Sequence, residues 1–156
     1  MLVGVLTDTH DNVPKFRAAI ESFRSRGVEH VIHAGDYVAL FAVRLLVESG
    51  IPFTGVFGNN DGEREGISTL TGDIHPSPHV FELGGRRIVV VHDPNKLPAA
   101  ARNGADAIIF GHTHVVLVDK GPPLRLNPGE CCGWVTGKCT AALLDLASLD
   151  VSLLEV

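Results

Sequence analysis

The stretch Met1-Leu-Val-Gly-Val-Leu-Thr-Asp-Thr-His10 is the part of this 156-residue sequence on which the fold prediction rests. Leu2 to Leu6 is a nearly continuous apolar run, which is typical of a strand buried on both faces of a sheet. Asp8 and His10 follow it, and on an extended chain their side chains would point to the same side. A carboxylate and an imidazole arranged in this way can bind a divalent metal. Because both residue types are also common in ordinary loops, this stretch alone leaves the two interpretations equally open.

Two helices are predicted to connect the first three strands. The first begins around Pro14, because proline needs no hydrogen-bond partner in the first turn, and Gly27 is predicted to end it. The second is predicted over residues 39–48, before Gly50. Three of its side chains are expected to face the sheet: Phe41, Leu45 and Leu46.

The strands predicted over residues 30–34 and 52–57 both lead into polar loops. Gly35-Asp36 follows the first strand, and Gly58-Asn59-Asn60-Asp61 follows the second. Such sequences form ordinary turns as well. Open α/β sheets, however, place their ligand sites just beyond the carboxyl ends of the strands. Three successive strand ends with candidate ligands therefore favour one shared site over three unrelated turns.

The second half of the chain is predicted to be mostly β. A hairpin is expected from 79–83 and 87–91 around Gly84-Gly85, and its second strand leads into His92. The buried strand 107–110 ends on Gly111-His112-Thr113-His114, which repeats the spacing of Asp8 and His10. Further strands are predicted over 115–119, 124–126, 139–146 and 151–156. Residues 62–78 show no clear pattern, and Glu63, Arg64 and Glu65 are interpreted as a solvated face at the rim of a cleft.

This order of elements predicts an α/β fold with two packed sheets flanked by helices. At this length the chain is predicted to be one domain, residues 1–156. No apolar run approaches the roughly 20 residues of a membrane span, and no signal peptide is found. With Cys131, Cys132 and Cys139 interpreted as reduced, buried hydrophobes, a cytoplasmic protein without membrane partners is expected. The formal charge of −5 argues against a broad nucleic-acid surface.

The polar residues at the strand ends form one candidate set. Their number suits two divalent ions that share a bridging carboxylate, for which Asp36 is the natural candidate. Mixed imidazole and oxygen ligands favour transition metals over Mg or Ca, with Mn as the first expectation and Ni, Fe, Zn or Co as alternatives. The expected metal ligands are Asp8, His10, Asp36, Asn59, His92, His112 and His114.

These motifs, in this order, resemble those of the calcineurin-like metallophosphoesterases, and the short chain resembles the small YfcE-type phosphodiesterases. The resemblance implies a four-layer αββα sandwich of two mixed sheets with a dinuclear metal site. It implies one metal held by Asp8, His10, Asp36 and His114, and the other by Asp36, Asn59, His92 and His112. It assigns Asp61 to orienting the ligands, and the expected catalytic residues are Asn60, Asp61 and His92. A homodimer is compatible with it.

One position departs from the wider family, in which a histidine usually follows the ligand asparagine. Here that position is Asn60, which can donate a hydrogen bond but not a proton at neutral pH. YfcE-type proteins are similar in lacking this histidine. The function expected is hydrolysis of a small phosphodiester by a hydroxide that two metals activate, and nucleotide-like diesters are among the candidate substrates. The alternatives are a non-catalytic protein-binding scaffold, a phosphomonoesterase, or a nuclease on polymeric nucleic acid.

Overall fold

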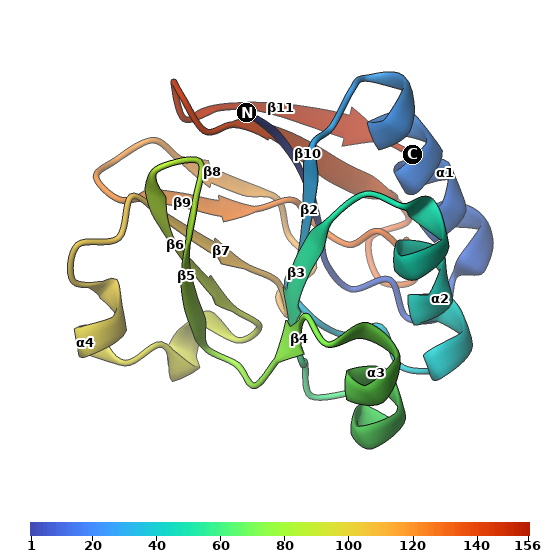
Figure 1. Cartoon of the computed structure of the whole chain (residues 1–156). Coiled ribbons are helices and arrows are strands. Elements are labelled where there is room, and N and C mark those ends of the chain that lie inside the picture. The colour runs from blue at the N-terminus through green and yellow to red at the C-terminus, as the bar shows by residue number, and fades with distance from the viewer.

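Two β-sheets form the centre of the protein, as a computed structural model that describes all residues 1–156 shows (Figure 1). The first sheet has six strands in the order β11-β10-β1-β2-β3-β4, and the second has five in the order β5-β6-β7-β9-β8. The strands of the first sheet are β1 (Leu2–Leu6), β2 (His30–His33), β3 (Phe53–Val56), β4 (Ile74–His75), β10 (Thr140–Asp145) and β11 (Asp150–Glu155). Those of the second are β5 (His79–Leu83), β6 (Arg86–Val91), β7 (Ala107–Phe110), β8 (Leu117–Asp119) and β9 (Leu124–Asn127).

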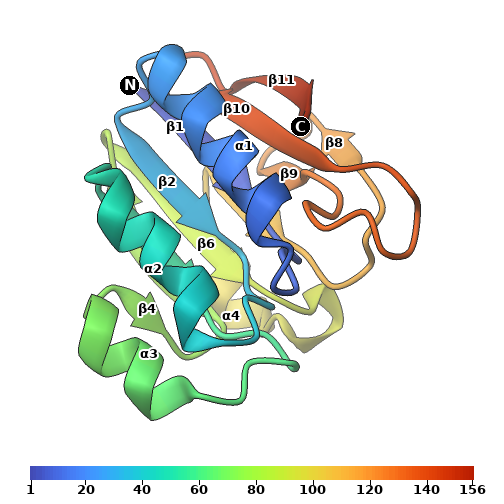
Figure 2. The same ribbon diagram turned by 90° about the vertical axis from the view of Figure 1, so that its right-hand side faces the viewer.

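Helices cover the outer faces of the two sheets, so the predicted αββα architecture is confirmed. Figure 2 shows α1, α2 and α3 along the outer side of the first sheet. A short 3-10 helix, η1, and α4 belong to the side of the second sheet (Figure 1). Their bounds are α1 (Val13–Ser25), α2 (Leu40–Ser49), α3 (Arg64–Thr71), η1 (Pro94–Lys96) and α4 (Ala99–Arg102). None of these helices combines the length and apolarity that a membrane span requires.

The hydrophobic core follows these layers. One cluster of 17 buried residues packs α1 and α2 against the first sheet, and it includes Phe16, Phe23 and Leu46. A second cluster of 14 buried residues fills the space between the sheets, with Val5 of β1 and Ile109 of β7 among its members. Because both faces of β1 are covered in this way, its continuous apolar sequence is explained.

One expectation about this half of the chain was wrong. Phe41 does not face the sheet, because it is 57% exposed. The buried stripe of α2 is centred instead on Ala42, Val43 and Leu46, which are all fully buried. Residues 62–78, for which the sequence gave no prediction, contain α3 and β4. Only Ile67 of α3 is buried, and this explains why its polar sequence gave no helical pattern.

Candidate metal centre

The predicted ligands lie on loops that follow the carboxyl ends of parallel strands. Strands β1, β2 and β3 run parallel in the first sheet, and β6 and β7 run parallel in the second. Asp8 and His10 follow β1, Asp36 follows β2, Asn59 follows β3, His92 follows β6, and His112 and His114 follow β7. The fold therefore brings together seven residues that span more than 100 positions of the chain.

A first group forms around Asp8, which is fully buried. Its Oδ1 atom lies 3.6 Å from Nε2 of His10 and 3.4 Å from Nε2 of His114. The rings of the two histidines stack with centroids 5.3 Å apart. One carboxylate and two imidazoles therefore converge on one point.

A second group forms around Asn59. Its Oδ1 atom lies 3.0 Å from Nε2 of His92 and 2.9 Å from Nδ1 of His112. The two imidazole rings meet edge to face, with centroids 5.2 Å apart. This group also presents one oxygen atom and two ring nitrogens.

Asp36 lies between the two groups and is 1% exposed. Its Oδ2 atom is 3.6 Å from Nε2 of His10 and 3.3 Å from Nε2 of His92. Burial opposes the ionisation of Asp36, but hydrogen bonds from His92 and Asn60 outweigh this effect and lower its pKa. The carboxylate of Asp36 is thus charged and within reach of both groups.

The hydrogen bonding of His92 fits a bound cation. Nδ1 of His92 donates to the carbonyl oxygen of Ala34 at 2.8 Å, so Nε2 of the neutral ring carries a lone pair. That lone pair faces two further acceptors, Oδ2 of Asp36 and Oδ1 of Asn59. Burial lowers the pKa of His92, but the Asp36 carboxylate outweighs this and raises it. A proton or a metal ion satisfies such an arrangement, and histidine ligands commonly donate their second ring nitrogen in this manner.

The group around Asp8 also contains polar atoms that a bound cation would satisfy. Oδ1 of Asp8 and Nε2 of His10 are buried and have no hydrogen-bond partner. The nearby Asp8 carboxylate raises the pKa of His10. Buried polar atoms are normally paired, so these two atoms point to an ion. The mixture of nitrogen and oxygen donors fits a divalent transition metal.

The backbone of the ligands is strained in a way that is typical of functional sites. Five of the seven have positive φ angles, between 38° and 67°: Asp8, His10, Asp36, His112 and His114. Such conformations are unfavourable for residues with a Cβ atom and persist only where the surroundings enforce them. Gly58 and Gly111 permit the close packing of these loops, because a Cβ atom would collide with Oδ1 of Asp36 at the former and with Oγ1 of Thr7 at the latter.

Asn60 and Asp61 both contact the loop of Asp36. The backbone and side-chain amides of Asn60 donate to the two carboxylate oxygens of Asp36, each at 2.8 Å. Asp61 is 4% exposed and accepts the backbone N–H groups of Asp36, Gly58 and Val38. Burial raises the pKa of Asp61. Asp61 thus binds backbone N–H groups and does not contact the side chains of the candidate ligands. Asn60, in contrast, binds the carboxylate of Asp36, which lies between the two ligand groups.

The remaining histidines lie outside this centre. His33 is fully buried and stacks on Tyr37 at 3.9 Å, and burial lowers its pKa well below the ordinary value. His75 and His79 stack on each other at 3.8 Å. His30 contacts the hydroxyl group of Thr54. We therefore assign these four rings to packing rather than to the candidate metal centre.

Glu130 was not predicted as a site residue, and it is fully buried behind His114. Its Oε2 atom lies 2.8 Å from Nδ1 of His114 and accepts the Cys132 thiol at 3.0 Å, while Oε1 accepts the hydroxyl group of Thr136 at 2.7 Å. Burial opposes its charge, but hydrogen bonds from Thr136, Cys132 and His114 outweigh this and hold the pKa at about 2. Glu130 follows β9, which runs parallel to β7. Its position shortly after the end of a strand is the one sequence feature from which its place near the site could have been predicted.

Cys132 is consequently more than a small apolar side chain. Its thiol donates to Glu130, and its Sγ atom lies within 4.8 Å of ring nitrogens of His10 and His114. Burial is the main reason why its pKa is raised to about 12. All three cysteines are free, as interpreted from the sequence, and Cys131 and Cys132 are buried. Cys139 is only partly buried, so the expectation of burial does not hold fully for it.

Glu130→Gln is expected to destabilise the protein in the presence of a chelator. The pKa of Glu130 is about 2 against an ordinary 4.5, so its charged form stabilises the fold above pH 4.5. This contribution is about 3 kcal/mol and is lost as the pH falls from 4.5 towards 2. Urea unfolding should give Glu130→Gln a lower free energy of unfolding at pH 7 and a shrinking difference from wild type below pH 4.5.

Glu155→Gln is the matched control, because Glu155 is exposed on β11. Its free energy of unfolding should stay within about 0.5 kcal/mol of wild type. An equal loss for both variants, or a difference for Glu130→Gln that does not change with pH, would contradict the role assigned to the buried carboxylate.

The fold and the two converging groups of histidines and oxygen donors define an α/β protein with a candidate metal centre at the strand ends of its two sheets. Residues 1–149 match the calcineurin-like phosphoesterase superfamily domain. The chain therefore belongs to the calcineurin-like phosphoesterase superfamily, and the family implies divalent metal ions. The resemblance inferred from the sequence motifs is confirmed.

Individual relatives agree with this placement. The chain is 36% identical to phosphodiesterase MJ0936 of Methanocaldococcus jannaschii over 93% of each chain. A solved structure of an archaeal phosphodiesterase superposes with a TM-score of 0.90 at 32% identity, covering 100% of both chains. YfcE, a phosphoesterase from E. coli, superposes with a TM-score of 0.74 at 22% identity, covering 99% of this chain and 98% of that one. At that identity the likeness to YfcE shows the fold alone.

Proposed function

We propose that this protein is a phosphodiesterase that depends on two divalent transition metal ions and hydrolyses small phosphodiesters. The observation that carries the proposal is the position of Asp36, whose Oδ2 atom lies within 4 Å of histidines in both ligand groups. Bound ions would activate water as a nucleophile and neutralise charge on the phosphate oxygens. The relatives named as phosphodiesterases support this reaction over the other phosphoester chemistries.

The protein residues have separate tasks in this proposal. Asp8, His10 and His114 hold one ion, Asn59, His92 and His112 hold the other, and Asp36 contacts both. Asp61 keeps the Asp36 loop in place through three backbone hydrogen bonds. Glu130 fixes the ring of His114 so that Nε2 faces Asp8. Asn60 is exposed at the open side of the centre and offers one further amide hydrogen to the substrate.

A protein-binding scaffold with this fold is the less favoured alternative. Such a scaffold has no need of seven converging ligand side chains or of the strained backbone that presents them. The net charge of −5 favours a small diester over polymeric nucleic acid. Mn²⁺ is the metal that we expect first, because the ligands mix imidazoles with several oxygen atoms.

Hydrolysis of bis(4-nitrophenyl) phosphate by the purified protein is expected to stop after treatment with a chelator. Addition of Mn²⁺ should restore it more fully than addition of Mg²⁺, since Mg²⁺ prefers oxygen ligands alone. The diester should be cleaved faster than 4-nitrophenyl phosphate. Metal content measured before and after chelation is the control.

Two outcomes would contradict the proposal. Full activity in protein shown to be free of metal would exclude the assigned chemistry. Absence of hydrolysis of both esters with every metal tested would favour the scaffold.

A further inference from the structure

A pocket of about 390 Å³ opens beside the candidate metal centre, and nothing in the proposed chemistry uses it. Two candidate ligands, Asn59 and His92, form one side of it. Its volume lies within the range of about 300–1,000 Å³ that is usual for ligand pockets. The remaining lining residues are Phe57, Gly58, Arg64, Pro76, Ser77, Asp93 and Lys96. The pocket is therefore polar, and it is continuous with the place where a phosphodiester would react.

Arg64 is fixed in this pocket by backbone atoms. Its Nε donates to the carbonyl oxygen of Asp61 at 3.0 Å, and its Nη2 donates to that of Gly58 at 2.7 Å. The guanidinium carbon lies 5.2 Å from the ring centroid of Phe57. No carboxylate lies within ion-pair distance of Arg64, so its charge is not neutralised by a protein partner. Gly58 immediately precedes Asn59, so this charge is held next to a candidate ligand.

Two further groups in the pocket can contact an anion. Lys96 is 73% exposed, and its Nζ atom lies 3.8 Å from Oδ2 of Asp93. Oγ of Ser77 accepts the backbone N–H of His92 at 2.9 Å, which leaves the hydroxyl hydrogen available to donate. The charges of Arg64 and Lys96 exceed that of Asp93 by one. The pocket thus presents net positive charge in a protein whose formal charge is −5.

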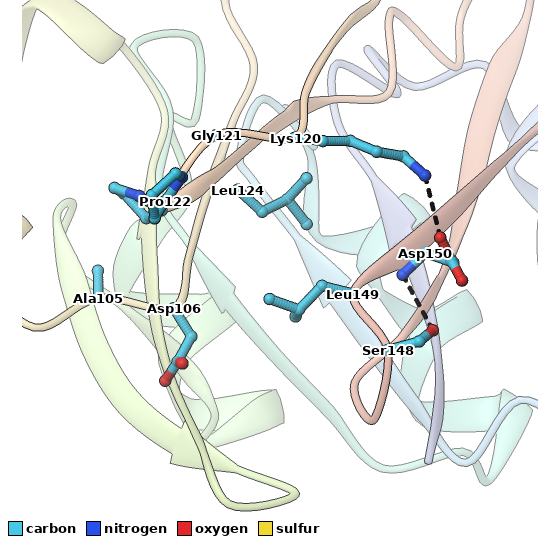
Figure 3. A pocket seen from close by; sticks show the side chains of 10 residues that line it. Ala105, Asp106, Lys120, Gly121, Pro122, Leu124, Ser148, Leu149 and Asp150 are labelled. Atoms are coloured by element: carbon cyan, nitrogen blue, oxygen red, sulfur yellow. Dashed lines mark hydrogen bonds and ion pairs between the residues drawn. The ribbon is translucent and has the colours of Figure 1, made fainter.

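The pocket in Figure 3 contains a cation that is paired with a carboxylate, unlike Arg64. It lies at the opposite end of β7, where Ala105 and Asp106 precede that strand. Its lysine, Lys120, is bound to Asp150 at 2.9 Å (Figure 3). The charge of Lys120 is neutralised by Asp150, and no candidate metal ligand lines this second pocket. It is therefore a much weaker candidate for binding an anion.

We propose that the pocket beside Asn59 and His92 binds a second phosphate group of the substrate. The inference rests on the proposed function and narrows it to a phosphodiester that carries another phosphate on one of its ester arms. A planar guanidinium can bind two phosphate oxygens at once, and Arg64 is held ready by its two carbonyl contacts. Lys96 adds a mobile charge at the mouth, and Ser77 adds a donor near His92.

The test compares 4-nitrophenyl phosphodiesters of a nucleoside with and without an additional phosphate on the sugar. Wild type should prefer the doubly phosphorylated ester by about tenfold in kcat/KM, mainly through KM. Arg64→Gln should bring the ratio of the two values close to one, and Lys96→Gln should lower it by about threefold. Arg44→Gln is the matched control, because it removes the same charge from an exposed position on α2 and should keep the wild-type ratio.

Binding of inorganic phosphate gives a readout that does not depend on hydrolysis. The NMR signal of the Arg64 Nε–H, identified by its loss in Arg64→Gln, should shift as inorganic phosphate is added. A ratio that stays at the wild-type value in both Arg64→Gln and Lys96→Gln, or falls equally in Arg44→Gln, would overturn the inference. If neither ester is hydrolysed, the proposed function fails, and the phosphate titration still decides whether the pocket binds an anion.

Discussion

Asp36→Ala is expected to abolish phosphodiester hydrolysis and to lower the bound metal more than the loss of any other candidate ligand. Asp36 is the side chain that lies within 4 Å of both histidine groups, so its removal takes a negative oxygen ligand from each. It also leaves the amides of Asn60 without their acceptor. Loss of a group that merely orients a ligand costs about 10–100-fold in metal affinity or activity, and we expect a larger loss here.

The comparison variant is His10→Ala, which removes one ligand from one group. Metal bound per chain, measured by elemental analysis, should fall strongly in Asp36→Ala and by about one ion in His10→Ala. Rates of bis(4-nitrophenyl) phosphate hydrolysis should follow the same order. Equal and full metal occupancy in both variants would refute the bridging position of Asp36. Circular dichroism of both variants would establish that the fold is kept.

The part of the site that follows from the sequence is the part made by strand ends. Each apolar run that stops at a polar residue marks the carboxyl end of a strand, and parallel strands bring these ends to one edge. Asp8, Asp36 and His112 could be predicted in this way although they are far apart in the chain. The same pattern places Glu130 after β9. Pro128 and Gly129 lie between this strand and Glu130 and are themselves typical turn residues, so Glu130 does not stand out in the sequence as a strand-end ligand.

Other features depend on contacts that no local pattern encodes. The helix α3 has one buried residue, Ile67, so no apolar stripe marks it in the sequence. Arg64 is exposed, as the interpretation of residues 63–65 as a solvated face predicted, but the sequence does not show that its guanidinium is bound to the carbonyl groups of Asp61 and Gly58. The thiol of Cys132 lies within 4.8 Å of ring nitrogens of His10 and His114, which belong to other loops of the chain. In each case the feature depends on how segments of the chain are placed in space, and the sequence pattern does not show this placement.

Asn60→His is expected to raise the rate on substrates with poor leaving groups. The leaving oxygen gains negative charge as the P–O bond breaks, and a histidine could protonate it. General acid catalysis of this kind is worth about 10²–10⁴-fold. Asn60 offers only a neutral hydrogen bond, and one hydrogen of its amide is already donated to Asp36. The wild-type rate should therefore depend steeply on the pKa of the leaving group, with aryl diesters cleaved much faster than alkyl diesters.

The measurement is kcat/KM for a series of substituted phenyl phosphodiesters with wild type, Asn60→His and Asn60→Ala. Asn60→Ala loses the same side-chain contact with Asp36 but gains no acid, so it separates the two effects of the substitution. The backbone N–H of Asn60 donates to Asp36, and neither substitution removes this group. A flatter dependence in Asn60→His alone would establish that residue 60 faces the leaving oxygen. Equal slopes in all three proteins, together with rapid cleavage of alkyl esters by wild type, would mean that a different group supplies the proton.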